Sequence, residues 1–196
     1  MYLSLLNLKI GKKSEGFIMT ITKRKWVVDQ THSSVDFSIK HLMISKVKGS
    51  FNEFTASIEA DVNDLTTGSI QLTVDANSID TRNTDRDNHL RSADFFDVEN
   101  HPTMTFVSKQ IEKKAENEYI VTGDLTIRGV TNTEKFKVTY EGHGVDPWGN
   151  EKVGFSSVSS INRSEYGLTW NAALEAGGVL VGDQIKFDIQ IQAVKA

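Results

Sequence analysis

Two segments of the chain place charged side chains beside large apolar ones, and residues 85–96 are the denser of the two. Guanidinium and imidazole groups in this segment could bind an anion at the entrance of a pocket that the neighbouring aromatic rings close. The structural alternative is a solvated surface helix whose aromatic residues cover the end of a barrel, with Arg86 paired to Asp87. Residue types alone favour that alternative. The side chains that the functional interpretation selects are Arg86, His89, Arg91, Phe95 and Phe96.

The second segment runs from Gly123 to Thr131 and is interpreted as structural. Gly129 at a strand end is suited to a hairpin turn with positive φ. Asp124 and Arg128 are expected to pair along an outer face. His41 follows an alternating apolar row. We interpret it as a histidine of the core or rim whose ring is hydrogen-bonded within the protein, and a contact with a ligand is the alternative.

Signatures of catalysis are missing from the sequence. There is no G-x-S-x-G elbow, P-loop or H-E-x-x-H motif. The five histidines lie far apart, and no pair has metal-ligand spacing. The chain has no cysteine, which excludes disulfides and thiolate metal sites. We therefore assign no catalytic residue, no metal and no cofactor.

The elements that must position these residues are strands. Residues 185–193 alternate five apolar with four polar side chains. This period of two places one kind of side chain on each face of an extended strand. The same alternation recurs along nearly the whole chain, so the apolar face must be buried against a second sheet, the far side of a closed sheet or an apolar ligand.

The strand pattern divides into about eight strands with hairpin connections and no βαβ spacing. A change of parity between Phe51 and Phe54 predicts a β-bulge near residues 52–53. The exception is a short helix that we expect from about Asp85 to Ser92, with Thr84 as its N-cap. The predicted class is all-β: a single antiparallel eight-stranded barrel, or a sandwich, with one short helix between strands.

The composition of the chain restricts the classes of partner that we expect it to bind. A formal charge of −4 without a face-sized basic cluster gives no support for nucleic-acid binding. No apolar run approaches the roughly 18 residues of a membrane span, so we expect no stable membrane insertion. Residues 1–18 differ from the rest and make a poor signal peptide. We expect them to be an N-terminal extension outside a domain of residues 19–196, and we expect a cytoplasmic protein.

A series of short motifs follows in a characteristic order. They are Asp29-x-x-His32-Ser33, His41-Leu42, Gly49-x-Phe51, residues 78–81, residues 86–96, His101-Pro102-x-Met104-x-Phe106-x-Ser108, residues 123–131, Ile161-Asn162-Arg163-x-x-x-Gly167 and Gly182-Asp183. In these motifs the chain, from about Trp26 to its C-terminus, resembles the YceI-like, lipocalin-like proteins that bind polyisoprenoids.

The resemblance implies an eight-stranded barrel whose apolar lumen holds a long isoprenoid, of the polyprenyl pyrophosphate or isoprenoid quinone type, for carriage or storage without catalysis. A barrel of eight strands is wide enough for one slender ligand. Another amphiphile, such as a fatty acid or fatty amide, is the first alternative. An enzyme acting on such a lipid is the second, with His41, His89 or Arg163 in the chemistry. The oligomeric state stays open, with a homodimer among the alternatives.

The expected site has two parts. The lumen residues are Phe37, Ile39, Phe51, Ile58, Leu72, Val74, Phe106, Phe187 and Ile189, and the alternation adds Ile191 to the same interior. The residues expected at the mouth, around the ligand's head group, are His41, Arg86, His89, Arg91, Phe95, Phe96 and Arg163.

Overall fold

The structure is a computed structural model that describes residues 23–173 and 178–196. The predicted extension of residues 1–18 and the domain start at residue 19 lie outside the described residues. No helix in the described part of the chain is long and apolar enough to cross a membrane.

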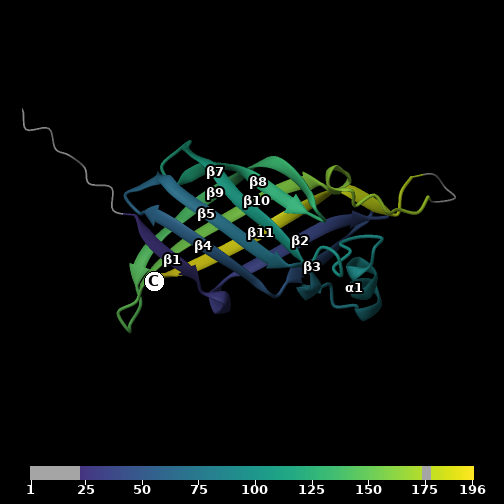
Figure 1. Ribbon diagram of the computed structural model, residues 1–196, viewed down its shortest axis with the longest axis horizontal. Helices are drawn as coiled ribbons and strands as arrows, with labels where there is room; N and C mark the ends of the chain where they lie inside the picture. Colours follow the sequence, from purple (N-terminus) through teal and green to yellow (C-terminus); the bar gives the residue numbers. More distant parts are fainter. Residues whose placement is uncertain (1–22, 174–177) are drawn as a thin grey trace, which may run out of the picture.

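One antiparallel sheet winds round and closes on itself (Figure 1). Its strands are β1 Arg24–Val28, β2 Ser34–His41, β3 Ser45–Phe51, β4 Phe54–Asp61, β5 Asp64–Asp75, β6 Ile79–Asp80, β7 Thr103–Lys113, β8 Glu118–Ile127, β9 Val130–Val145, β10 Glu151–Asn162 and β11 Val181–Lys195. Three 3₁₀ turns, Gln30–His32, Ala76–Ser78 and Arg163–Tyr166, and one helix, α1 Thr84–Arg91, complete the described elements.

The closure uses eight strand positions. β1 and β2 both pair antiparallel with β11, so they act as one strand interrupted by the first 3₁₀ turn. β4 pairs with β1, and β3 pairs with β2, so they likewise form one position. The others follow as antiparallel neighbours in the order β5, β7, β8, β9, β10 and β11. This confirms the predicted eight-stranded antiparallel barrel with one short helix.

The interruption between β3 and β4 falls at residues 52–53, where the change of parity predicts a bulge. Phe51 and Phe54 on either side are both buried, because the skipped residues restore the inward orientation of the apolar row. Arg128 and Gly129 form the predicted β8–β9 turn with φ values of 49° and 74°.

Two local predictions are wrong. Asn83, and not Thr84, is the N-cap of α1, because the Asn83 side-chain oxygen accepts from the Arg86 N–H. Asp124 does not pair with Arg128: its carboxylate contacts Lys109 Nζ at 2.6 Å on the neighbouring strand. Arg128 instead donates to the backbone carbonyls of Gly167 and Ala93.

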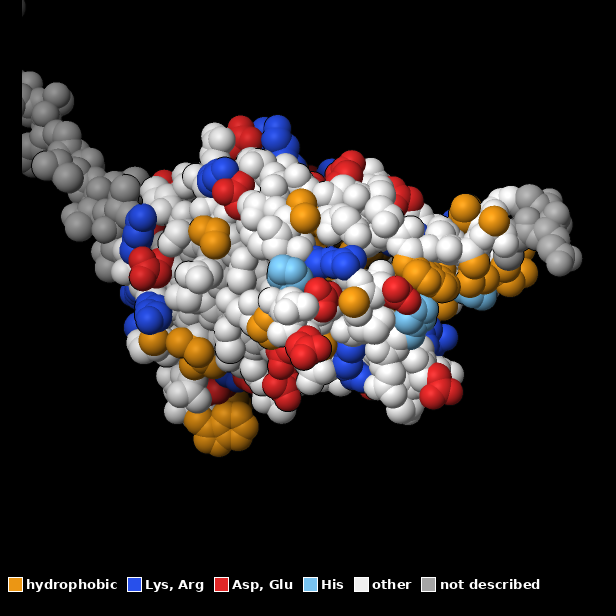
Figure 2. Space-filling model, turned by 45° about the vertical axis from the view of Figure 1, so that its right-hand side comes forward, with side chains coloured by type: hydrophobic (Ala, Val, Ile, Leu, Met, Phe, Trp, Pro, Cys, Tyr) orange, Lys and Arg blue, Asp and Glu red, His pale blue; other side chains and the backbone are white. Residues whose placement is uncertain are grey.

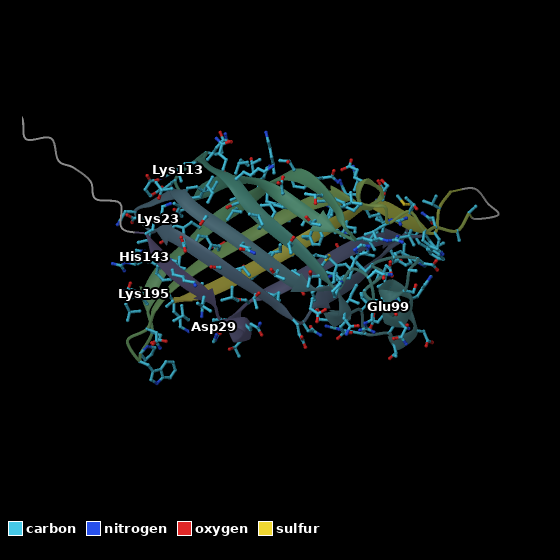
Figure 3. The ribbon with its side chains drawn as sticks, in the orientation of Figure 1. Lys23, Asp29, Glu99, Lys113, His143 and Lys195 are labelled. Carbon is cyan, nitrogen blue, oxygen red and sulfur yellow. The ribbon has the colours of Figure 1, made fainter. Side chains whose placement is uncertain are left out.

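The chain between β5 and β7 leaves the barrel wall and carries α1 at one end of the molecule, near the labelled Glu99 (Figure 3). Lys195 lies at the opposite end, near which a compact group of apolar side chains packs. The fold therefore has one end built from loops and α1, and one end with a packed interior.

Candidate functional site

The barrel interior contains two adjoining cavities. The inner cavity has a volume of about 1040 Å³ with its open side included, and it is lined by inward side chains from all around the barrel. Its polar lining side chains are Thr105, Ser156 and Ser157. The apolar lining residues that matter most here are Ile58, Leu72, Val74, Phe106, Ile189 and Ile191.

The outer cavity lies on the α1 side and has a volume of about 1330 Å³, again with its open side included. Its charged and imidazole side chains are Lys40, His41, Asp85, Arg86, His89 and Arg163. Four residues, Phe51, Met104, Ile127 and Phe187, line both cavities. The two cavities therefore adjoin at these four side chains, and charged side chains are found in the lining of the outer one.

The inward residues of β11 show that side chains do not fill this interior. Ile185, Phe187, Ile189 and Ile191 are only half-buried, although they point inward and alternate with exposed or polar residues. A packed core would bury such residues fully. Their accessible surface instead faces the cavities.

The predicted lumen residues divide between the two cavities. Phe51, Ile58, Leu72, Val74, Phe106, Phe187, Ile189 and Ile191 line the inner cavity, whereas Phe37 and Ile39 line the outer one. Phe37 lies opposite Gly49 on β3, where an added Cβ would approach the Phe37 ring to 2.5 Å. Glycine at residue 49 thus leaves room for this ring.

Arg86 projects from α1 into the lining of the outer cavity. Its Nε donates to Thr81 Oγ1 at 2.7 Å and its Nη2 to the Thr81 carbonyl at 2.8 Å. No ion pair joins Arg86 to Asp87, which instead accepts hydrogen bonds from Thr81. Nη1 of Arg86 has no hydrogen-bond partner among the described residues and can still donate to a ligand.

Aromatic rings surround His89 on the same wall. The His89 ring stands edge-on to Phe95 and to Trp170, with centroid distances of 5.1 and 4.8 Å. Its Nε2 lies 2.8 Å from the Asp94 carboxylate. Phe96 packs edge-on against Phe51, one of the residues common to both cavities. The aromatic pair at residues 95–96 is therefore part of the cavity wall.

Arg163 is buried, with 4% of its surface exposed, and still lines the outer cavity. Its Nε donates to the Gly182 carbonyl, and its Nη1 donates to the carbonyls of Leu168 and Trp170. Burial lowers the pKa of this guanidinium, and the negative charge of Asp183 opposes that effect. Nη2 makes no hydrogen bond to the described residues. Arg163 thus holds two loop carbonyls and one carbonyl of β11, and keeps one donor group available.

His41 and Arg91 differ in position. His41 ends β2 and lines the outer cavity. Arg91 does not belong to the lining of either cavity. Its guanidinium donates to the carbonyls of Asn77 and Ile79 and to the Asn88 side chain, so it ties α1 to the preceding segment. The geometry gives Arg91 a structural role instead of the predicted one at the mouth.

Several lining residues were not predicted. Trp170 and Leu168 follow the last 3₁₀ turn in a segment without periodicity, so no pattern indicated which way their side chains point. Met104 and Ile127 lie on predicted strands and were identifiable as inward from their alternation. Lys40 and Asp85 also line the outer cavity, although the alternation along β2 places Lys40 on the face opposite to Ile39 and His41.

Metal ligation finds no support in the described ranges 23–173 and 178–196, where no three His, Cys, Asp or Glu side chains gather closely enough to hold an ion. The site has apolar walls, two arginines that each keep a spare donor, two histidines, Lys40 and Asp85.

Comparison with known families places the chain in one group. A model of the YceI-like domain matches residues 26–193. The chain belongs to the YceI-like family. The match covers every strand of the barrel except the ends of β1 and β11, together with both arginines of the outer cavity.

Relatives from staphylococci are similar over most of their length. A UPF0312 protein of Staphylococcus epidermidis is 48% identical over 165 residues, which cover 84% of this chain and 94% of the relative. A UPF0312 protein of Staphylococcus aureus is 45% identical over 161 residues, covering 82% and 91%.

Solved structures share the barrel. BcnA of Burkholderia cenocepacia has a TM-score of 0.73 at 28% identity, covering 84% of this chain and 98% of BcnA. The YCEI protein of Campylobacter jejuni has a TM-score of 0.70 at 34% identity, covering 81% and 90%. A polyisoprenoid binding domain from Saccharophagus degradans has a TM-score of 0.67 over 87% of this chain and 98% of the domain, but at 16% identity it shows the fold alone.

Proposed function

We propose that the barrel binds a long-chain isoprenoid, of the polyprenyl pyrophosphate or isoprenoid quinone type, for carriage or storage without catalysis. The observation that carries this proposal is the pair of adjoining cavities, with apolar walls along the inner one and charged side chains in the lining of the outer one. A slender amphiphile matches this division, with its chain inside and its head group beside α1.

The cavity walls support a ligand with a long chain. The lining of the inner cavity is apolar apart from Thr105, Ser156 and Ser157, and this cavity adjoins the outer one at four shared residues. Each CH₂ group that leaves water for such walls contributes about 0.8 kcal/mol. A chain that passes the residues common to both cavities would bury more apolar surface than a short one, so affinity should increase with chain length.

The spare arginine donors support an anionic or strongly polar head group. Nη1 of Arg86 and Nη2 of Arg163 are both unpaired within the described part of the chain, and both residues line the outer cavity. Arginine forms its strongest hydrogen bonds with phosphate and carboxylate oxygens. The same donors could receive the carboxylate of a fatty acid, which keeps that amphiphile as the competing ligand. The fold shared with the Saccharophagus domain adds an analogy in favour of the isoprenoid.

Binding without catalysis is the simpler account of the polar side chains. His89 faces Asp94 and two aromatic rings, and the hydroxyl of Ser45, which lies opposite His41, donates to the His41 carbonyl and not to its imidazole ring. A nucleophile within hydrogen-bond reach of its base is the usual arrangement for covalent catalysis. These histidines are better suited to orienting a head group.

The test is a titration with isoprenols of increasing length, using the full chain and two matched variants. Ala56 lines the inner cavity, and its neighbour Ser57 on β4 faces outward and is exposed. Ala56→Phe should weaken binding of the longest isoprenol by about tenfold, equivalent to about 1.4 kcal/mol, and should affect the shortest one least. Ser57→Phe should bind as the unchanged chain does.

Affinity that does not depend on chain length would contradict the proposal, as would an Ala56→Phe variant that binds every isoprenol normally. Tighter binding of fatty acids than of all isoprenols would favour the competing amphiphile.

A further inference from the structure

The turn between β2 and β3 exposes three consecutive apolar side chains. Leu42, Met43 and Ile44 are 36%, 55% and 85% exposed. Leu42 and Met43 have positive φ values of 52° and 60°, and the Ile44 N–H donates back to the His41 carbonyl at 3.2 Å. This is a tight hairpin turn with both central residues in the left-handed region.

Such a turn is unfavourable for these residue types. Turns with two positive φ values favour Asn-Gly, because a bulky side chain is strained in the left-handed region. Strained backbone persists at functional sites when the surrounding structure holds it. Apolar side chains that are both strained and exposed therefore need an explanation other than stability.

These side chains lie beside the outer cavity. The Leu42 N–H donates to the Leu180 carbonyl at 2.8 Å, and Leu180 lines that cavity. Val179, next in the chain, is 43% exposed. We call Leu42, Met43, Ile44 and Val179 the turn patch. Figure 2 shows hydrophobic side chains gathered at the right-hand end of the molecule, the end of the barrel with α1.

Unpaired lysines flank the turn patch on the same hairpin. Lys40, Lys46 and Lys48 are exposed, and Lys40 lies directly opposite Lys46 across the two strands. None of the three makes an ion pair or a side-chain hydrogen bond with the described residues. The whole chain carries a formal charge of −4, so this positive charge is local.

We propose that the turn patch docks onto the surface of an anionic lipid bilayer and holds the outer cavity against it. Apolar side chains would enter the boundary between head groups and acyl chains, while the lysines contact anionic head groups. This contact would let an apolar ligand pass between bilayer and barrel. The inference goes beyond the ligand binding proposed above, and its test requires no lumen ligand.

A second copy of the chain is the less suitable occupant. A symmetric contact through the turn patch would bring the two sets of lysines together, and like charges across an interface oppose association. The patch comprises four side chains, whereas stable interfaces involve about 20–30 residues on each side.

The experiment is flotation of the full chain with phosphatidylcholine vesicles, with and without phosphatidylglycerol. We expect binding to the anionic vesicles that decreases at high salt, because salt screens the lysines. The triple variant Leu42→Asn, Met43→Gly, Ile44→Ser should lower the vesicle-bound fraction by about tenfold. Its melting temperature should not fall, because Asn-Gly suits this turn better than Leu-Met does.

Two further variants make the test specific. Lys46→Glu with Lys48→Glu should also release the protein from anionic vesicles. Trp148→Ser serves as the matched control, because Trp148 is 84% exposed on the β9–β10 turn at the other end of the barrel. This control should float like the unchanged chain.

Failure of the full chain to float with anionic vesicles would overturn the proposal, as would unchanged flotation of the triple variant. A dimer in light scattering that the triple variant converts to a monomer, without flotation, would assign the patch to a second copy instead. Isoprenol binding by the triple variant is measured separately. This second measurement distinguishes a failure of the docking proposal from a failure of the lumen-binding proposal.

Discussion

Arg86 and Arg91 lie on the same short helix, but their guanidinium groups face different surroundings. Each donates to backbone carbonyls or side chains of the segment before α1. Of the two, Arg86 also lines the outer cavity. This difference provides a controlled test of the head-group site.

Arg86→Ala should weaken binding of a polyprenyl pyrophosphate more than binding of the matching alcohol. A charged hydrogen bond contributes about 1.5–3 kcal/mol, which corresponds to roughly tenfold or more for the pyrophosphate. Both variants lose contacts to the segment before α1, so Arg91→Ala should destabilise the fold to a similar degree without changing the preference between the two ligands. Calorimetric titration of both ligands measures the effect, and equal losses in Arg86→Ala would make Arg86 structural.

Asp29 shows how a single carboxylate stabilises the other side of the barrel. It accepts from Thr31 and from Gln192 Nε2, and its Oδ2 lies 3.1 Å from Lys152 Nζ. Hydrogen bonds from Thr31 and Lys152 hold the pKa of the Asp29 carboxyl well below its ordinary value of 3.8. The charged form is therefore the one that the fold favours.

Asp29→Asn should lower the free energy of unfolding near neutral pH by about 1–3 kcal/mol. Because the folded-state pKa is depressed, this contribution is complete above pH 3.8 and is lost as pH falls below it. Urea unfolding at several pH values should show the gap between the two proteins closing in acid. Asp64→Asn, which neutralises a carboxylate that accepts from Thr66 without an ion pair, should cost less. A gap that is constant with pH would contradict the account.

The helix α1 is held to the barrel through Thr81 and Asp87. Asp87 is 6% exposed and accepts from both the N–H and the hydroxyl of Thr81. Thr81 in turn accepts from Arg86, so one small network fixes the arginine at the outer cavity.

Asp87→Ala should destabilise the protein by about 1–3 kcal/mol, because a buried N–H loses its partner. It should also weaken pyrophosphate binding through the displaced Arg86. Asp85, two residues earlier on α1, is exposed, and Asp85→Ala should leave the melting temperature unchanged. Thermal melts of the two variants measure the difference. A normal melting temperature for Asp87→Ala would show that this network does not hold the helix.

The strands were predictable because alternation with a period of two determines which side chains share a face. Phe187, Ile189 and Ile191 all line the inner cavity, as their spacing indicates. The partner of a polar side chain was not predictable, because it depends on strand register. Asp124 contacts Lys109 because the register of β7 and β8 places Val107 opposite Asp124. Nothing in the sequence around these residues indicates that register.

The charged part of the site was predictable to a lesser extent. The motif around Arg163 indicated its importance, but its burial depends on where the loop of residues 168–170 and Gly182 at the start of β11 place their carbonyls. Trp170 lies in the same aperiodic stretch and contacts His89 only through tertiary packing. Loop geometry of this kind leaves no periodic signal in the sequence.

Across the whole molecule, the family match begins at residue 26, which lies after Met19. We therefore expect a chain that starts at Met19 to fold and bind as the full chain does. Its melting temperature and its isoprenol affinity should match those of the full chain. A fall of several degrees on truncation would show that the extension contributes to the fold.

The central claim is that the lumen holds a long isoprenoid chain, and mass spectrometry of an organic extract of the purified protein tests it most directly. Two variants are prepared in parallel. Ala56→Phe is the sample whose inner cavity is obstructed, and Ser57→Phe is its matched control. The account predicts an isoprenoid, recognisable by its repeating unit, in extracts of the unchanged chain and of Ser57→Phe, and strongly depleted in Ala56→Phe. An extract that contains fatty acids or amides in place of isoprenoids, or equal amounts of isoprenoid from all three proteins, would contradict it.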